Sequence, residues 1–238
     1  MGLQPTKTTA AKTLFLIILI TFCAVTALAH QPRIVQEASQ DNPVIVNDPE
    51  VSKAYYAELT GTPHYYKIQT DKTIRFYVNI LTPEAEGGRP DFLINLFKDE
   101  KQIVTIQGNT WKPYYEEFAR DDYWQGPEYE SQLEPGTYYI VVSGEKNTGK
   151  YALAIGKVES FPIKEIIRTI YLLPTLKTWF FGKSLLTAYF NIVGVSLLLV
   201  FVLLFIMVTL TIWYRKKTKA ESKGLKNVGL SKNRGGKE

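Results

Sequence analysis

The chain has 238 residues, of which 28 are Lys or Arg and 23 are Asp or Glu, giving a net charge of +5. It contains only two histidines, His30 and His64, and one cysteine, Cys23, which lies in the apolar N-terminal run. A mature chain without that run has too few ligands for a zinc site of three or four nitrogen and sulfur atoms. The charge is segregated: residues 30–160 carry 13 basic against 20 acidic side chains, whereas residues 215–238 carry 9 against 2. The isoelectric point of the chain, about 9.0, is therefore high because of the basic C-terminal tail. It gives no support to nucleic-acid binding by the acidic segment.

The first 29 residues have the pattern of a secretory signal peptide. Lys7 and Lys12 precede an apolar run over residues 14–27, and the run ends in the small-x-small sequence Ala-Leu-Ala at 27–29, which signal peptidase recognises. We expect cleavage before His30. The alternative is an uncleaved anchor, which would give a hairpin of two spans with both termini inside.

The predicted mature chain contains no cysteine, because Cys23 lies inside the signal peptide. An exported domain of this kind must fold without disulfides. The sequence also has no Asn-x-Ser/Thr glycosylation site. These two features favour a prokaryotic cell-surface or periplasmic setting.

Residues 51–159 show the period of two that is typical of β-strands. In residues 73–80 every second side chain is apolar, namely Ile74, Phe76, Val78 and Ile80. Further strands are predicted over residues 92–97, 102–107, 138–142 and 150–156. Residues 30–50 contain three prolines and no period, so we expect an extended leader or an edge segment there.

Turn sequences separate these strands. Glu-Pro-Gly-Thr at 134–137 places Pro and Gly where a type II turn requires them. Thr-Gly-Thr-Pro at 60–63 separates the apolar runs 54–59 and 64–69. Short strands at this spacing, without a helical period of useful length, predict an all-β antiparallel sandwich over residues 51–159.

Three segments of this region resemble the closing strands of prokaryotic pre-peptidase C-terminal domains. They are residues 91–97 (DFLINLF), 133–142 (LEPGTYYIVV) and 149–153 (GKYAL). The resemblance covers residues 60–156 and implies a jelly-roll-like β-sandwich that serves as a binding or secretion module without catalysis. The chain departs from the family pattern in its long aromatic insertion and in having no attached protease.

Residues 111–129 form the densest group of aromatic and acidic side chains. One interpretation is a saccharide- or peptide-binding face, in which flat rings stack on the ligand and carboxylates accept hydrogen bonds from it. The other is a long crossover between sheets whose aromatic side chains cap the core while the acids are solvated. The candidate ligand-binding residues are Trp111, Tyr114, Tyr115, Asp121, Asp122, Tyr123 and Trp124.

The acidic residues raise two further possibilities. A Ca²⁺ site would draw oxygen ligands from the pair at 121–122 and from Asp91, Glu116 or Glu117, although no EF-hand spacing is present. Acid pairs also serve glycoside hydrolysis, but such pairs are common in any acidic domain. His64 stands beside a turn, and no Gly-x-Ser-x-Gly, phosphate-loop or dinucleotide motif occurs, so we expect no enzymatic activity and no bound cofactor.

Residues 160–183 are predicted to form an amphipathic and aromatic membrane-proximal segment. Ser160 and Pro162 mark a helix start, and the apolar face of the helix comprises Ile163, Ile166, Ile167 and Ile170. Pro174 should end or kink this helix, and an aromatic collar follows, formed by Trp179, Phe180 and Phe181. We expect the helix to lie on the outer leaflet. The alternative is that residues 163–173 pack against the sandwich as its last core element.

Residues 184–214 contain no charged side chain, and these 31 residues exceed the roughly 20 that cross a bilayer as a helix. The basic run at 215–219 predicts that the C-terminal end is cytosolic and the N-terminal domain lies outside. Residues 215–238 are expected to be a disordered basic tail that rests on anionic lipids.

The sequence therefore predicts a single-pass membrane protein with an extracytoplasmic β domain. The leading hypothesis is a non-enzymatic binding module for a saccharide, peptide or protein partner. The alternative is a structural accessory subunit of a membrane complex, docked through the membrane-proximal helix and the span.

Overall fold

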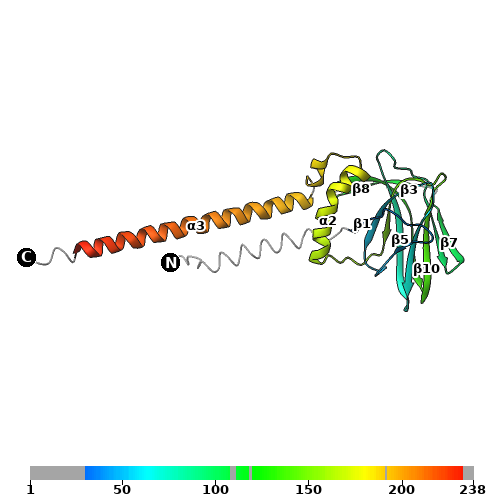
Figure 1. Cartoon of the computed structure of the whole chain (residues 1–238), viewed down its shortest axis with the longest axis horizontal. Helices are drawn as coiled ribbons and strands as arrows, with labels where there is room; N and C mark the ends of the chain where they lie inside the picture. Colours follow the sequence, from blue (N-terminus) through cyan, green and yellow to red (C-terminus); the bar gives the residue numbers. More distant parts are fainter. Residues whose placement is uncertain (1–29, 108–110, 118–119, 191, 233–238) are drawn as a thin grey trace, which may run out of the picture. The chain divides into compact units, whose positions relative to one another are not determined.

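The computed structural model describes residues 30–107, 111–117, 120–190 and 192–232. The chain divides into two compact units. One, within residues 19–194, holds a β domain and the segment that follows it, and the other contains most of the long helix α3 (Figure 1). The expected signal peptide, residues 1–29, lies outside the described residues.

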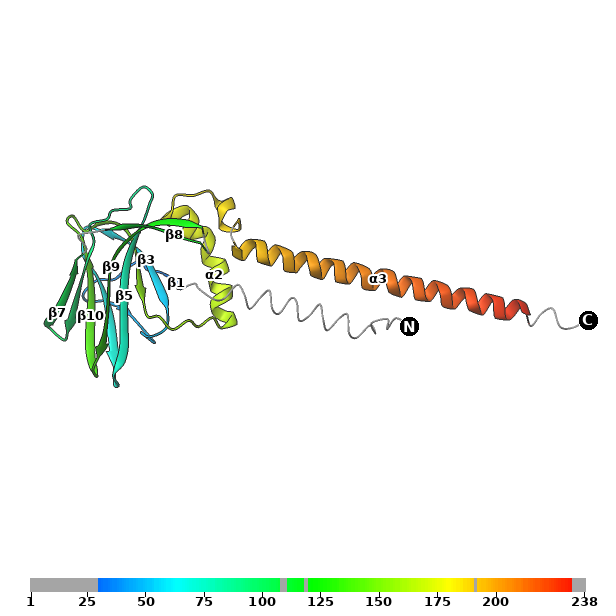
Figure 2. The same ribbon diagram turned by 180° about the vertical axis from the view of Figure 1, so that it is seen from behind.

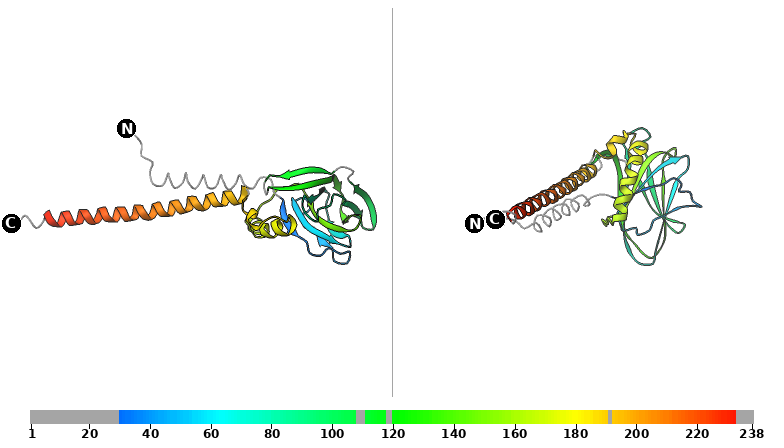
Figure 3. Two further views of the ribbon diagram at one scale, coloured as in Figure 1. Left: turned by 90° about the horizontal axis from the view of Figure 1, so that it is seen from above. Right: turned by 60° about the vertical axis from the view of Figure 1, so that its left-hand side comes forward.

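The β domain consists of two sheets that pack as the layers of a sandwich (Figure 3). The larger sheet has the order β1 (Gln31–Ile34), β3 (Lys53–Thr60), β11 (Thr148–Ile155), β5 (Ile74–Pro83), β9 (Asp121–Leu133) and β8 (Lys112–Glu116). The smaller sheet has the order β2 (Val44–Ile45), β4 (His64–Thr70), β10 (Gly136–Ser143), β6 (Leu93–Lys98) and β7 (Lys101–Gln107). The predicted sandwich is thus confirmed.

Both sheets are mixed, which corrects the expectation of a purely antiparallel sandwich. β1 runs parallel to β3 and β2 runs parallel to β4, whereas the other neighbouring strands are antiparallel. The chain leaves β1, forms β2 in the opposite sheet and then returns to β3, so a crossover rather than a hairpin joins β1 to β3. Residues 30–50 therefore supply one edge strand to each sheet.

The main hydrophobic core lies between the two sheets. The predicted alternation in β5 is confirmed, because four of its side chains are at most 3% exposed: Ile74, Phe76, Val78 and Ile80. Burying an aliphatic or aromatic side chain of this size contributes about 1.5–3 kcal/mol. The period-two segments of the sequence therefore account for most of this core.

One polar network crosses the core. The hydroxyl of Tyr151 lies 2.8 Å from His64 Nδ1 and 2.8 Å from the hydroxyl of Tyr66. Both tyrosines are fully buried and His64 is nearly so. Burial lowers the pKa of His64 from its ordinary value of 6.5, because the charged imidazolium loses its hydration. His64 is therefore a satisfied core residue that joins β4 to β11.

A helical segment follows β11 and lies beside β1 (Figure 2). It comprises α2 (Ile163–Thr175), the π-helical turn η1 (Leu176–Phe180) and the 3₁₀ turn η2 (Leu185–Ala188). Pro174, expected to end or kink the helix, lies in the last turn of α2, and the chain continues directly into η1. The hydrogen-bond spacing widens there because proline has no N–H to donate and crowds the preceding turn.

The helix α3 (Ile192–Lys232) contains an apolar stretch, Leu198–Lys219, with a mean hydropathy of 2.2, which is long enough to cross a membrane. Two boundaries differ from expectation. The predicted span began at Ser184, but Ser184 caps η2 through a bond from the Leu186 N–H to its side chain. At the other end α3 continues to Lys232 through residues expected to be disordered, because Lys, Ala and Glu are good helix formers.

The buried His64 predicts a specific sensitivity to acid. As pH falls below about 6.5, the unfolded chain gains a proton at this residue and the folded chain does not. The contribution of neutral His64 to the free energy of unfolding is therefore fully present above pH 6.5 and is lost on acidification. His64→Gln should reduce the fall in the free energy of unfolding between about pH 7.5 and about pH 5, measured by urea denaturation of the full chain in mild detergent.

His30 is the matched control, because it is the other histidine of the chain and its ring contacts Ser52, outside the Tyr151 network. His30→Gln should leave unchanged the part of the pH dependence of the free energy of unfolding that His64 contributes. Equal pH dependence in the wild type and in His64→Gln would contradict the prediction.

Candidate functional site

The aromatic segment forms a hairpin at the edge of the larger sheet, not a crossover between sheets. β8 pairs with β9 from Lys112 opposite Gln125 to Glu116 opposite Asp121. Trp111 precedes β8 and packs half-buried against the main core. Gly126 makes room for it, since an added Cβ there would lie 2.7 Å from the Trp111 ring.

The candidate ligand-binding residues do not share one face of this hairpin. Side chains alternate across a strand, so Asp121 and Tyr123 lie on one face of β9, and Asp122 and Trp124 lie on the other. Tyr123 is 5% exposed, and its ring centroid lies 6.3 Å from that of Tyr114. Tyr115 is opposite Asp122 and shares its face. The structure therefore separates the six residues of the hairpin strands into two groups, and Asp121 and Tyr123 of the first group are buried.

The face that holds Tyr123 is covered by the membrane-proximal segment. Leu176, Phe180 and Phe181 pack against Tyr123 of β9 and Ala152 of β11, forming a second hydrophobic cluster outside the main core. The Phe180 ring meets Tyr56 of β3 edge-on at 4.9 Å, and the Phe181 ring meets Tyr123 edge-on at 5.2 Å. Two members of the expected aromatic collar, Phe180 and Phe181, are thus buried in the domain, whereas Trp179 is half-buried.

A buried ion pair lies within this second cluster. Lys177 Nζ donates to Asp121 Oδ2 at 2.6 Å, and both side chains are 2% exposed. Lys183 Nζ lies 3.1 Å from Asp121 Oδ1, so both carboxylate oxygens face ammonium groups. Asp121 therefore neutralises lysines of the same chain, in contrast to the expectation that it contacts a ligand or Ca²⁺. Among the described residues, no group of three His, Cys, Asp or Glu side chains is placed to hold a metal.

The isoleucine face of α2 points away from the β domain. Ile163 and Ile167 are 73% and 63% exposed, and Ile166 and Ile170 are partly exposed. The side packed on the domain carries Glu165, which is 9% exposed. The cause is an ion-pair network: Glu165 lies 2.8 Å from Arg33 of β1 and 3.1 Å from Arg168.

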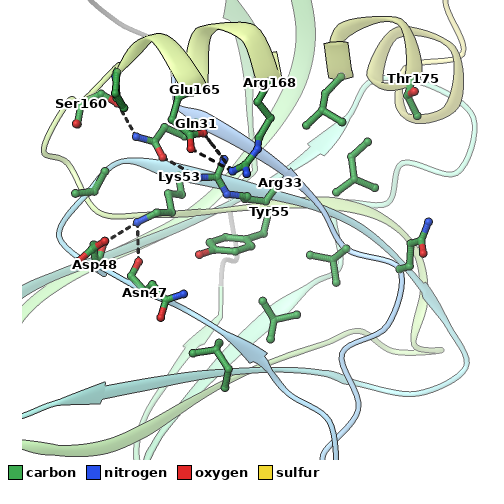
Figure 4. A pocket seen from close by; sticks show the side chains of 18 of the residues that line it. Gln31, Arg33, Asn47, Asp48, Lys53, Tyr55, Ser160, Glu165, Arg168 and Thr175 are labelled. Atoms are coloured by element: carbon green, nitrogen blue, oxygen red, sulfur yellow. Dashed lines mark hydrogen bonds and ion pairs between the residues drawn. The ribbon is translucent and has the colours of Figure 1, made fainter. Parts of the chain in front are cut away.

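A cavity of about 960 Å³ opens where α2 meets the edge strands of both sheets (Figure 4). Its wall is formed by β1, β2, the loop before β3, and α2. The lining is balanced in charge, with three basic side chains, Arg33, Lys53 and Arg168, and three acidic ones, Glu37, Asp48 and Glu165. Apolar side chains, among them Ile34, Val44 and Leu172, fill the spaces between them.

The polar groups of the cavity are held in fixed positions. Lys53 is 7% exposed, and its Nζ donates to the backbone carbonyls of Asn47 and Asp48 at 2.7 and 2.8 Å. Burial lowers the pKa of this lysine, while Asp48 acts in the opposite direction. Gln31 Nε2 donates to the Ser160 carbonyl at 2.5 Å, and Arg33 Nη2 donates to Gln31 Oε1 at 2.9 Å (Figure 4). The cavity therefore presents a preorganised polar wall.

Sequence reasoning did not identify the cavity. Its residues come from the expected leader and from the helix that follows the sandwich, which are far apart in the chain. The available signals were weak: Lys53 sits at the start of an apolar strand, and Glu165 falls beside Ile166 in the amphipathic pattern. Neither indicates a cavity without knowledge that β1 and α2 are neighbours.

No protein-family model matches this chain, and no curated protein is similar to it in sequence. The pre-peptidase C-terminal domain of a collagenase from Bacillus anthracis is similar in structure over 54% of this chain and 97% of that domain, with 10% identity and a TM-score of 0.30. It belongs to the family that residues 91–97, 133–142 and 149–153 resemble.

Two β-glucosidases are also similar in structure. The enzyme from Paenibacillus barengoltzii matches 54% of this chain with 16% identity and a TM-score of 0.26. The enzyme from Kluyveromyces marxianus matches 47% with 13% identity and a TM-score of 0.25. The chain spans only 14% and 13% of the lengths of these enzymes.

The Glu165 network predicts how firmly α2 is attached to the β domain. Glu165→Ala would leave Arg33 and Arg168 without their shared carboxylate and should lower the free energy of unfolding by about 2 kcal/mol, less than the roughly 3–5 kcal/mol of a fully buried pair. The measurement is urea denaturation of the full chain. Glu130→Ala removes an exposed carboxylate that pairs with Arg75 and Lys157, and it should leave the midpoint unchanged. Equal effects of the two substitutions would contradict the prediction.

Proposed function

We propose that this chain is a non-enzymatic, single-pass membrane protein whose extracytoplasmic β domain binds a ligand in the cavity between α2 and the edge strands. The observation that carries the proposal is the cavity itself. Its volume of about 960 Å³ lies at the upper end of the range of roughly 300–1,000 Å³ typical of ligand sites. Its mixture of apolar walls and fixed polar groups is also typical of such sites.

The chemistry of the lining favours an extended peptide segment of a partner over a charged small molecule. The three basic and three acidic side chains offer partners for both signs of charge. Among the residues that the structure describes, β1 and β2 each pair with only one neighbour in their sheets, and an edge strand leaves backbone groups that a peptide can engage. A saccharide is the other ligand class that such hydrogen-bonding groups support.

The membrane orientation in this proposal follows from charge. The apolar stretch of α3 ends in the basic residues 215–219, which favour the cytosolic side. The acidic β domain then lies outside, in agreement with the signal-like sequence of residues 1–29.

The cavity can be tested by filling it. The full chain in nanodiscs is screened against arrays of extended peptides and of saccharides, and the ligands found are titrated against variants. Ile45 is 55% exposed and lines the cavity, so Ile45→Arg should fold and weaken binding by about tenfold or more. Ile103→Arg on β7, at the far edge of the smaller sheet, is the matched control, because Ile103 is 47% exposed.

The same titration separates the cavity from the aromatic hairpin. Trp124→Ala should leave the affinity unchanged if the ligand occupies the cavity. A ligand that is lost in Trp124→Ala and retained in Ile45→Arg would move the site to the hairpin. The absence of any ligand in both arrays would contradict the binding function.

A second candidate function is positioning by α2, favoured by its exposed apolar stripe. Ile163, Ile167 and Tyr171 follow one another at helical spacing and are 63–80% exposed. Only residues 176–191 separate α2 from α3 in the sequence, and this short connection supports a role of the stripe at the bilayer. We assign the stripe to the lipid interface. The accessory-subunit hypothesis would require a protein partner on the same stripe.

A probe on the stripe distinguishes lipid from protein. With Cys23 replaced by Ser, a fluorophore on Ile167→Cys in nanodiscs should be quenched by nitroxide-labelled lipids, because an amphipathic helix inserts its apolar face about 5–10 Å into the interface. The same fluorophore on Ile103→Cys should not be quenched. A different result would support the accessory subunit instead. In that case nitroxide-labelled lipids would not quench the fluorophore at residue 167, and the fluorophore would be shielded from aqueous quenchers only when a partner protein co-purifies.

A further inference from the structure

Lys177 and Asp121 stand in a nearly water-free enclosure. The Lys177 Nζ and Asp121 Oδ2 are 2.6 Å apart, and each side chain is 2% exposed. Tyr123, Phe180 and Phe181, which are 5% exposed or less, form the surrounding cluster. The Phe181 ring centroid is 5.5 Å from the ammonium nitrogen. A primary amine and a carboxyl group are thus held in contact with little water between them.

A second carboxyl group lies beside the first. Glu116 of β8 is directly opposite Asp121 of β9 in the hairpin register, which places the two side chains on the same face with Cβ atoms about 5 Å apart. Glu116 is half-buried, and its charge acts on Lys177. On the other side of Asp121, Lys183 Nζ lies 3.1 Å from Oδ1. Asp121 is therefore flanked by an amine, a second carboxylate and a cation.

We propose that Lys177 and Asp121 become joined by an intramolecular amide bond, with Glu116 as the proton-transfer group and Lys183 as the electrostatic stabiliser. This assigns the cluster as the site of a self-catalysed covalent modification. The product would be an isopeptide cross-link between β9 and the turn η1.

The reaction balances without any co-reactant. One proton moves from the Lys177 ammonium to the Asp121 carboxylate, giving a neutral amine and a neutral acid. The Nζ lone pair then attacks Cγ, and the negative charge that develops on Oδ1 faces the Lys183 ammonium, as in an oxyanion hole. Glu116 takes a proton from the nitrogen and returns it to Oδ2. The Cγ–Oδ2 bond breaks, one water molecule leaves, and the Nζ–Cγ amide remains.

The surroundings favour each of these steps. Burial lowers the pKa of Lys177, opposing the effect of Asp121, and thereby increases the fraction of neutral amine that acts as the nucleophile. Fixed contact between the reacting groups supplies the proximity that is worth an effective concentration of about 10⁵ M or more in oriented reactions. The apolar enclosure disfavours the charged reactants and excludes the water that would hydrolyse the product.

The other ion pairs of the described residues do not meet these conditions. Arg33 and Arg168 carry guanidinium groups that stay protonated, and Lys157 and Glu130 are 55% and 46% exposed. Lys183 is 32% exposed, and its second partner Asp122 is 51% exposed. Lys177 and Asp121 form the only one of these pairs in which both side chains are buried.

Mass spectrometry of the full chain tests the cross-link. The protein is purified in mild detergent, denatured and weighed, and its N-terminus is read from the same digest so that any signal cleavage is known. The expected mass is about 18 Da below that of the linear sequence, equal to one lost water. The digest should contain a branched peptide that joins residues 121 and 177. A mass equal to the linear sequence, with both peptides recovered unbranched, would overturn the proposal.

Variants assign the roles. Lys177→Arg keeps the positive charge but should have the mass of its linear sequence. Glu116→Gln should fold, as judged by circular dichroism, but most of its molecules should lack the cross-link. Asp122→Asn is the matched control, because it removes the neighbouring carboxylate that also contacts Lys183, and it should remain fully linked. Complete linkage in Glu116→Gln, or a branch from Lys177 to another residue, would overturn the assigned mechanism.

Discussion

The contact between Lys177 and Asp121 determines where the membrane-proximal segment lies. Removing two charges from water is costly, and their attraction offsets that cost only with close geometry, which a distance of 2.6 Å provides. A different packing of η1 would leave Asp121 buried without its partner, so the pair selects one register of the segment on the sheet. Phe180 and Phe181 then reach Tyr56 and Tyr123 as a consequence of that register.

This contact gives the larger sheet two buried faces instead of one. β11 shows the effect: Tyr151 and Leu153 point into the main core, and Ala152 points to the second cluster. In an antiparallel sandwich the outer face is ordinarily solvated. Here the small Ala152 leaves room for the aromatic residues of η1, and the sheet is covered by a segment that follows it in sequence.

The period of two predicted the strands of the main core because each of those strands has one apolar and one polar face. It did not predict β1 and β2, since four-residue and two-residue strands are too short to show a period and Pro32 resembles a loop residue. The ion pair of Asp121 could not be predicted, because its partner Lys177 lies 56 residues further along the chain and no local pattern connects the two.

The β domain needs residues beyond its last strand. Residues 51–159 contain every strand from β3 to β11, but the outer face of the larger sheet is completed only by residues 172–181. A fragment that stopped at residue 159 would expose Tyr56, Ala152 and Tyr123 and would leave the Asp121 carboxylate on the same surface without its ammonium partners. Such an apolar surface with an unpaired charge is a liability for solubility and for folding. The structural unit therefore extends to the segment before α3, so the element that leads into the apolar helix α3 is also part of the fold that would bind a ligand.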